Sequence, residues 1–166
     1  MAIRVTVVGA GARGLDWLRE IRSGPDFELA ACVDVDAEAL RRAASECGAA
    51  GGACYTNLGE ALEKHPCDAV VVATPADLHE AACEAALARG LGVIVEKPFT
   101  LRLAAAARLV RAAAQAHAPL IVAQYYRYMR AFRTARRLVG EGALGRVGQA
   151  VCQYYRVPHG MAASLA

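Results

Sequence analysis

The stretch VIVEKPFT at residues 93–100 places a lysine where an apolar strand should end. Three apolar residues that suit a buried strand run directly into Glu96, Lys97 and Pro98. A lysine in this position is either a solvated charge or a proton donor and acceptor beside a bound ligand. The motifs found elsewhere in the sequence favour the second interpretation, so Lys97 is the candidate catalytic residue.

Two further details of this stretch bear on its chemistry. If the strand continues through the motif, alternation turns Glu96 and Lys97 to opposite faces, so they are poor candidates for a paired acid and base. Pro98 fixes the exit of the chain from the strand. The sequence leaves the cis or trans state of the peptide bond before Pro98 open.

A glycine-rich turn closes the first apolar run of the chain, VTVVGAGARG. Its glycines take the G-x-G-x-x-G spacing, in which the first allows a tight turn, the second lets the backbone approach a pyrophosphate, and the third lets a helix lie close to the strand. The helix that begins there points free N–H groups and its positive dipole end at the phosphates. The residues of this loop that are predicted to belong to the cofactor site are Gly9, Gly11, Ala12, Arg13 and Gly14.

An acidic residue at the end of the second apolar run completes the pattern of a dinucleotide site. Asp34 lies twenty residues after Gly14, where a carboxylate can bind the hydroxyl groups of the adenosine ribose. The same carboxylate would repel a 2′-phosphate, so the sequence favours NAD over NADP as the cofactor. Arg13 keeps NADP open as the alternative, because a guanidinium in the glycine loop could turn toward that phosphate.

The elements that position these residues follow from an alternation of short apolar runs and longer alanine-rich segments. Continuous apolar runs are typical of strands that are covered on both faces. Strands are predicted at residues 3–9, 28–35, 69–75, 92–98 and 120–126, with a weaker one near residues 54–56. Helices are predicted at residues 13–22, 36–47, 58–64, 78–89 and 101–117, with Asp77 and Thr100 as N-caps of the last two.

This order of elements predicts the fold class. Short joints between strand and helix require parallel pairing through right-handed crossovers, hence an α/β fold with a Rossmann-type, doubly wound and mostly parallel sheet. The carboxyl ends of the strands then share one edge, where such folds bind their ligands. We therefore expect Lys97 on the same edge as the glycine loop.

The composition excludes several other classes of protein. Of the 166 residues, 56% are hydrophobic and 21% are charged, as in a folded globular protein. The net charge of +3 is too small to indicate a nucleic-acid partner. No apolar run or leader sequence indicates a membrane or secretion, so a cytoplasmic location is expected.

The cysteines indicate neither a metal site nor a disulfide framework. They occur without a C-x-x-C pair and without a histidine at the spacing of a metal site. The chain is therefore expected to hold no metal and to keep its cysteines as reduced, mostly buried thiols. The six cysteines are Cys32, Cys47, Cys54, Cys67, Cys83 and Cys152.

Four motifs occur in a set order: GAGARG at residues 9–14, VDVD at residues 33–36, ATPADLH at residues 73–79 and VEKPFT at residues 95–100. Together they resemble the Gfo/Idh/MocA oxidoreductase family, and the resemblance covers nearly the whole chain. It implies an NAD(P)-dependent dehydrogenase or reductase. Such an enzyme would transfer a hydride between nicotinamide and a CH–OH carbon of a sugar, polyol or related small molecule.

The resemblance also implies roles for individual residues. Lys97 would lie beside the nicotinamide and the substrate hydroxyl and assist the movement of a proton. Thr74 and Pro75 would flank the cofactor, and His79 would belong to the same rim, although at the start of a helix it could instead cap or pack. The complete set of predicted cofactor-binding residues is Gly9, Gly11, Ala12, Arg13, Gly14, Asp34, Thr74, Pro75, His79, Glu96 and Lys97.

The last part of the chain resembles the family's passage out of the dinucleotide domain. Residues 1–123 are predicted to form the NAD(P)-binding domain, and residues 124–166 a connecting helix, a Gly-x-x-Gly turn and the first strand of a second α+β domain, at residues 145–157. The helix has an arginine-rich outer face, which is expected to pair with carboxylates and not with nucleic acid or a membrane. Its arginines are Arg127, Arg130, Arg133, Arg136 and Arg137.

The chain ends where the family's second domain would begin, so a fragment or a truncated gene model is expected. That domain would supply the substrate pocket, a further catalytic Asp and His, and a sheet through which homo-oligomers could form. Two hypotheses follow. The chain is either the cofactor half of an oxidoreductase, or a non-catalytic dinucleotide-binding sensor or interaction module.

Overall fold

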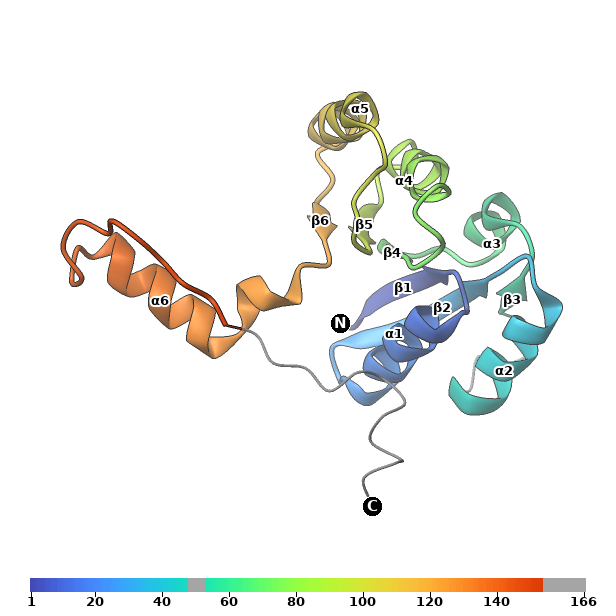
Figure 1. The fold of residues 1–166 in the computed structure, drawn as a ribbon. Coiled ribbons are helices and arrows are strands. Elements are labelled where there is room, and N and C mark those ends of the chain that lie inside the picture. Colours follow the sequence, from blue (N-terminus) through green and yellow to red (C-terminus); the bar gives the residue numbers. More distant parts are fainter. Residues whose placement is uncertain (48–52, 154–166) are drawn as a thin grey trace, which may run out of the picture. The chain divides into compact units, whose positions relative to one another are not determined.

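The computed structural model of the chain describes residues 1–47 and 53–153. They form two compact units, Met1–Gln124 and a second unit that begins at Tyr125 (Figure 1). The first unit is built around a β-sheet and contains all the predicted site residues. The described part of the second unit is helical and irregular, without strands.

The first unit contains a six-stranded sheet in which neighbouring strands are parallel. Its strands are β1 (Ile3–Val8), β2 (Phe27–Val33), β3 (Cys54–Tyr55), β4 (Ala69–Val72), β5 (Gly92–Val95) and β6 (Leu120–Val122). The order across the sheet is β3-β2-β1-β4-β5-β6, so the direction of strand addition reverses between β1 and β4. Ligands of such sheets bind at the carboxyl ends of the strands, around this switch point. The predicted doubly wound parallel sheet is confirmed.

Helices cover both faces of this sheet (Figure 1). They are α1 (Ala12–Ser23), α2 (Ala37–Cys47), α3 (Leu58–Lys64), α4 (His79–Leu87) and α5 (Leu103–Gln115). The first two pack in one apolar cluster, which includes Val71 of β4, and the other three pack in a second cluster, which includes Val70 and Val72. Successive residues of one strand thus point to opposite, buried faces, which explains why the strand runs are continuously apolar.

The five strands predicted from apolar runs all end earlier than predicted, and β4, β5 and β6 differ most. The last pair in the register of β4 and β5 is Val72 with Val95, and β6 ends at Val122. The residues that follow β4 and β5 form loops at the carboxyl edge of the sheet, whereas Tyr125 and Tyr126 of the last run begin a 3-10 helix of the second unit. Glu96 and Lys97 therefore lie in a loop, so the strand alternation that predicted opposite faces for them does not apply.

The predicted N-caps of two helices are wrong. α4 begins at His79, two residues after Asp77, and α5 begins at Leu103, in both cases without a side-chain cap. The Thr100 hydroxyl instead donates a hydrogen bond to the carbonyl oxygen of Arg102 (2.9 Å). Threonine side chains readily bond to nearby backbone groups, and this local bond replaces the predicted cap.

Cys67 and Cys83 are free thiols, and both they and Cys32 are buried in the apolar clusters of the first unit. Burial raises the pKa of the Cys83 thiol to about 12. The reactive thiolate of Cys83 therefore hardly forms at neutral pH. The side chain of Cys47 is outside the described residues.

The second unit contains the 3-10 helix η1 (Tyr125–Tyr128) and α6 (Arg130–Gly140). The rings of Tyr126 and Phe132 meet edge to face, with 5.7 Å between their centroids, and join the two helices. α6 confirms the helix that the spacing of its apolar residues predicted.

The chain after α6 agrees only in part with its sequence pattern. Gly142 and Gly145 both have a positive φ (+71° and +63°), so the predicted Gly-x-x-Gly turn is present. The strand predicted at residues 145–157 is not formed over residues 145–153. The described part of this unit offers no second strand for it to pair with. Residues 154–157 lie outside the described residues.

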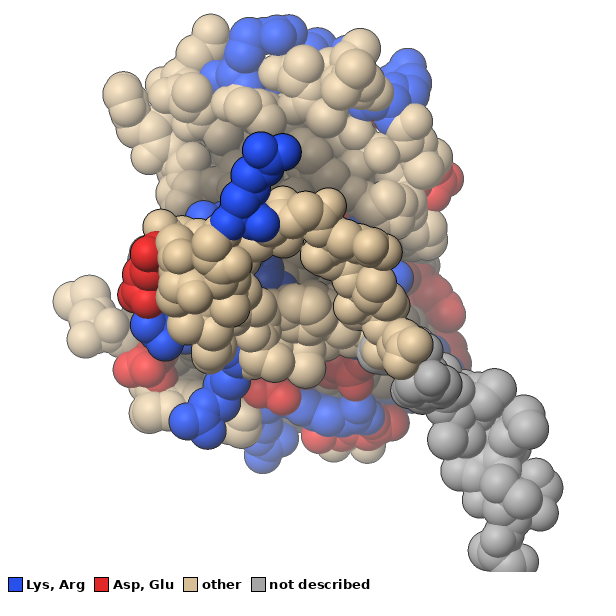
Figure 2. Space-filling model, turned by 60° about the vertical axis from the view of Figure 1, so that its left-hand side comes forward, with Lys and Arg blue, Asp and Glu red and all other residues tan. Residues whose placement is uncertain are grey.

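Charged side chains of both signs occur on one face of the molecule. Figure 2 shows Lys and Arg side chains singly or in small groups, with Asp and Glu side chains between them on the face that it presents. In the second unit, Arg137 pairs with Glu141 (2.7 Å). Over residues 1–47 and 53–153, no helix has both the length and the apolar character needed to cross a membrane.

Candidate functional site

The glycine loop between β1 and α1 is packed very closely against neighbouring backbone. A Cβ atom on Gly14 would lie 1.8 Å from the carbonyl oxygen of Gly9. A Cβ atom on Gly9, whose φ of +94° already favours glycine, would lie 2.7 Å from backbone atoms of Ala73 and Thr74. Gly9 thus lets the loop after β4 approach β1, and Gly14 lets α1 lie against the end of β1.

Gly11 differs from the other two glycines of the motif because it faces open space. It is the N-cap residue of α1, and beyond its chain neighbours no described atom lies within 4 Å of the place that a Cβ atom would take. No side chain caps the helix, and the Leu15 N–H donates to the Gly11 carbonyl oxygen (2.9 Å). The N–H groups before Leu15 precede the first bond of the helix, so they and the helix dipole suit a phosphate. This open cradle fits a diphosphate.

Asp34 is held directly against the glycine loop. One oxygen of its carboxylate accepts a hydrogen bond from the N–H of Ala10 (2.6 Å), and the other accepts one from the N–H of Asp36 (2.9 Å). Each carboxylate oxygen has a second acceptor position, which leaves room for ribose hydroxyl groups. A negative charge fixed at this point disfavours a second anion such as a 2′-phosphate.

His79 joins two loops at the carboxyl edge of the sheet. His79 is buried, with only 1% of the residue exposed. Ring nitrogen Nε2 lies 2.9 Å from the carbonyl oxygen of Thr74, and Nδ1 lies 2.9 Å from that of Pro98 and 3.3 Å from that of Phe99. The ring therefore connects the loop after β4 with the loop after β5. Of the roles that the sequence left open for His79, these contacts support packing within the protein.

The hydroxyl group of Thr74 is not satisfied by hydrogen bonds to the described residues. Its hydroxyl oxygen is buried, and none of the described residues provides a hydrogen-bond partner for it. A buried hydroxyl without a partner costs free energy, and a polar group of a ligand can supply the missing bond. The Thr74 backbone lies beside Gly9, so this hydroxyl belongs to the same edge as the glycine loop. Pro75, the next residue, is exposed.

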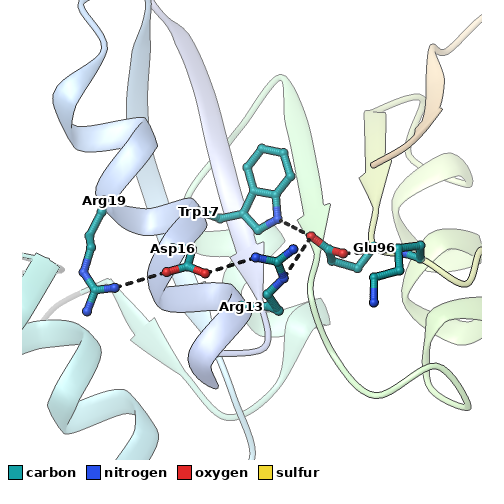
Figure 3. A network of polar contacts seen from close by, with 6 residues as sticks. Arg13, Asp16, Trp17, Arg19 and Glu96 are labelled. Carbon is teal, nitrogen blue, oxygen red and sulfur yellow. Dashed lines mark hydrogen bonds and ion pairs between the residues drawn. The ribbon is translucent and has the colours of Figure 1, made fainter. Parts of the chain in front are cut away.

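Glu96 reaches from the loop after β5 to α1 (Figure 3). The residue is 7% exposed. Its Oε1 accepts a hydrogen bond from the indole N–H of Trp17 (3.1 Å) and lies 3.8 Å from Nε of Arg13. Its Oε2 accepts from the backbone N–H of Lys97 (3.3 Å). The carboxylate thus connects the start of α1 with the backbone of the candidate catalytic lysine.

Lys97 is exposed at the edge of the sheet between two fixed neighbours. Glu96 before it is bound to α1, and the carbonyl oxygen of Pro98 after it lies against the His79 ring. The Lys97–Pro98 peptide bond, whose state the sequence left open, is cis. In the part of the chain that the structure describes, the Lys97 ammonium has no ion-pair partner, so it is available to a ligand.

Arg13 is directed toward the β5 side of the sheet. Its guanidinium bonds to Asp16 (3.2 Å) and approaches Glu96, which follows β5 (Figure 3). Asp34 follows β2, and β2 and β5 lie on opposite sides of the β1–β4 pair. This arrangement does not support the alternative in which Arg13 binds a 2′-phosphate near Asp34.

A hollow next to this edge is a weaker candidate for a ligand site. Its volume of about 260 Å³ is below the roughly 300–1,000 Å³ of typical small-molecule pockets. The Glu80 carboxylate in it already pairs with Arg102 (2.8 Å) and with Arg108. The hollow is lined by Ala76, Asp77, Glu80, Thr100, Leu101 and Arg102.

The predicted site residues are brought together at one edge of the sheet. The glycine loop contacts Asp34 on one side and Thr74 on the other, and His79 and Glu96 tie the loop of Lys97 to them. Sequence reasoning missed Trp17. Its only signal is that it is the single tryptophan of the chain, three residues after the last glycine of the motif.

Comparison with protein families gives a match over most of the chain. The model for GFO_IDH_MocA, described as "Oxidoreductase family, NAD-binding Rossmann fold", matches residues 3–124. Among curated proteins, an inositol 2-dehydrogenase of Leifsonia xyli subsp. xyli is 35% identical over 147 residues, which make up 87% of this chain and 42% of that protein.

Two solved structures show the same fold. The scyllo-inositol dehydrogenase from Lactobacillus casei with bound NAD(H) and scyllo-inositol has a TM-score of 0.80 at 25% identity, covering 87% of this chain and 43% of that one. The WlbA dehydrogenase from Bordetella pertussis in complex with NADH and UDP-GlcNAcA has a TM-score of 0.80 at 28% identity, covering 88% of this chain and 44% of that one. The chain spans less than half the length of these relatives.

The crowded and the open glycine give a matched test of the loop geometry. Gly14→Ala is expected to lower the free energy of unfolding by about 2 kcal/mol or more, because the methyl group must displace the Gly9 backbone. Gly11→Ala is expected to change it by less than about 1 kcal/mol, because its methyl group enters open space. Urea denaturation followed by circular dichroism measures both. Equal losses in the two variants would contradict the described packing.

Proposed function

Because the chain belongs to the Gfo/Idh/MocA oxidoreductase family and carries its NAD-binding Rossmann fold, we propose that this edge of the sheet binds NAD for an oxidoreductase reaction. Bound NAD supplies the acceptor or donor of a hydride that is exchanged with a CH–OH carbon of the substrate. Lys97 accepts or donates the proton that accompanies this hydride transfer. The observation that supports this best is the joining of the glycine loop, the loop after β4 and the loop after β5 at one edge.

In this proposal, residues on the two sides of the switch point hold the two ends of the cofactor. The open cradle at Gly11 and the N–H groups of α1 take the diphosphate. Asp34, already fixed to the loop, takes the adenosine ribose, and its charge favours NAD over NADP. The unsatisfied Thr74 hydroxyl and Lys97 remain for the nicotinamide end. His79 and Glu96 hold these loops in place.

Lys97 carries the proton chemistry. In the oxidation of an alcohol, its neutral amine accepts the hydroxyl proton as the C–H bond breaks, and it becomes an ammonium. In the reverse direction, the ammonium gives this proton to the carbonyl oxygen, which becomes a hydroxyl. The exposure of Lys97 lets it exchange the proton with water between turnovers.

The proposed substrate is a sugar, a polyol or a related small molecule. This class is supported by the relatives, two of which are named as inositol dehydrogenases. We place the protein in the cytoplasm, where free thiols such as those of Cys67 and Cys83 remain reduced.

Titration with NAD⁺ tests the cofactor site. Isothermal titration calorimetry is expected to show NAD⁺ binding, and Gly11→Ala is expected to weaken it about tenfold or more, because the new methyl group occupies the cradle. NADP⁺ is expected to bind at least about tenfold more weakly than NAD⁺, because Asp34 repels the 2′-phosphate.

Gly140→Ala is the matched control for this titration. Gly140 ends α6 and also faces open space, so this variant is expected to bind NAD⁺ as the unchanged chain does. Wild-type affinity in Gly11→Ala would remove the glycine loop from the cofactor site.

Substitution of Lys97 tests the catalytic role. In the natural gene product, with NAD⁺ and with myo-inositol and scyllo-inositol as probe substrates, Lys97→Ala is expected to lower kcat by about 10²–10⁴-fold. Affinity for NAD⁺ should be largely retained, because the glycine loop, Asp34 and Thr74 still hold the cofactor. Lys64→Ala is the control, since this exposed lysine of α3 pairs with Glu60 (2.7 Å). Full turnover in Lys97→Ala would exclude Lys97 from the mechanism.

A further inference from the structure

Trp17 is the member of this edge to which no motif assigns a role. It is half-buried on α1, less than one turn after Gly14. Its indole N–H donates to Oε1 of Glu96 (3.1 Å), a residue 79 positions away in the sequence. This bond connects the helix that begins at the glycine loop with the loop that carries Lys97 (Figure 3).

Glu96 is suited to act as an anchor for the lysine next to it. Its Oε1 is approached by Trp17 and Arg13, and its Oε2 accepts from the Lys97 backbone N–H. The residue is 7% exposed, so little water competes for these contacts. Hydrogen bonds to a carboxylate are among the stronger ones in proteins. These contacts therefore restrain both the Glu96 side chain and the backbone at Lys97.

Contacts on both sides of Lys97 fix its backbone relative to other parts of this edge. On the far side of Lys97, the Pro98 carbonyl oxygen is held by His79, which fixes the loop relative to the β4 loop. Trp17 and Glu96 fix it relative to α1 and hence to the cradle at Gly11. Small displacements of a catalytic group lower reaction rates strongly, so a proton-transferring lysine needs its backbone fixed relative to the cofactor.

We propose that Trp17 and Glu96 form a positioning pair that fixes the backbone of Lys97 relative to the glycine loop. Arg13 contributes a longer contact to the same oxygen atom of Glu96. The proposal rests on the proposed function, because the pair acts through Lys97. It assigns a positioning role, not a catalytic one, to both residues.

The first test needs neither cofactor nor turnover. NMR hydrogen exchange of the ¹⁵N-labelled chain measures how often the Lys97 N–H opens. Trp17→Phe keeps an aromatic ring and removes the N–H donor, so it is expected to speed exchange at Lys97 about tenfold. Exchange at Val71 in β4 should be unchanged. The control is Arg19→Ala, because Arg19 lies on the same helix and pairs with Asp16 and Glu46; it should leave exchange at Lys97 unchanged.

A second variant reports on the same contact from the other side. Trp17 is the only tryptophan of the chain, so the fluorescence emission of the protein reports on its indole. Glu96→Gln removes the charge that the indole N–H faces, and a shift of the emission maximum is expected. This measurement also serves if Trp17→Phe does not fold.

Turnover then separates positioning from general structural support. In the natural gene product, Trp17→Phe is expected to lower kcat about tenfold while NAD⁺ affinity is retained. It should cause no further loss when combined with Lys97→Ala, because the pair acts through Lys97.

The results that would overturn the positioning pair are distinct from those that would overturn the proposed function. Unchanged exchange at Lys97 in Trp17→Phe, or an unchanged emission maximum in Glu96→Gln, would overturn the pair. Undiminished turnover in Lys97→Ala would instead overturn the catalytic role of Lys97, whatever the exchange and emission results.

Discussion

The close approach of α1 to the end of β1 is the contact on which the rest of this edge depends. At Gly14 the helix lies so near the Gly9 carbonyl oxygen that a methyl group does not fit between them. This approach leaves the start of the helix open at Gly11. It also brings the N–H of Ala10 within reach of Asp34, and the indole of Trp17 within reach of the loop after β5. A side chain at position 14 would disturb all of these contacts together.

The parallel sheet explains why so few residues suffice to build the edge. All strands of the first unit end at the same side, so the loops after β1, β2, β4 and β5 are neighbours without long insertions. Two buried polar side chains then join these loops: Glu96 accepts hydrogen bonds from an indole and a backbone N–H, and the ring nitrogens of His79 lie against loop carbonyl oxygens. Buried hydrogen bonds of this kind fix relative positions more than they add stability. The exposed Lys97 is thereby attached to a fixed backbone.

Much of this arrangement could be predicted from the sequence, because its signals are local. Continuous apolar runs identify buried parallel strands, and the spacing of the glycines and Asp34 identifies a phosphate loop with its acidic partner. The limits of the strands could not be predicted, because an apolar run does not show where pairing with a neighbour stops. The apolar run therefore predicts a strand that includes Glu96 and Lys97, whereas the strand ends at Val95.

Contacts between residues far apart in the chain also could not be predicted from the sequence. The hydrogen bond from Trp17 to Glu96 spans 79 positions and depends on the position of α1 relative to the sheet. The predicted N-cap at Thr100 is wrong for a related reason, because its hydroxyl has a local alternative partner in the Arg102 carbonyl oxygen. The packing of His79 depends on three loop carbonyls whose positions are set only by the folded sheet.

The central claim is that one dinucleotide lies across the loops of this edge, with Lys97 at one end. Amide chemical-shift mapping of the ¹⁵N-labelled chain during NAD⁺ titration tests it most directly. The account predicts saturable shifts at residues 9–15, 34–36, 73–75 and 96–99, with little change elsewhere in the sheet. Shifts confined to other surfaces, or the absence of shifts at saturating NAD⁺, would contradict it.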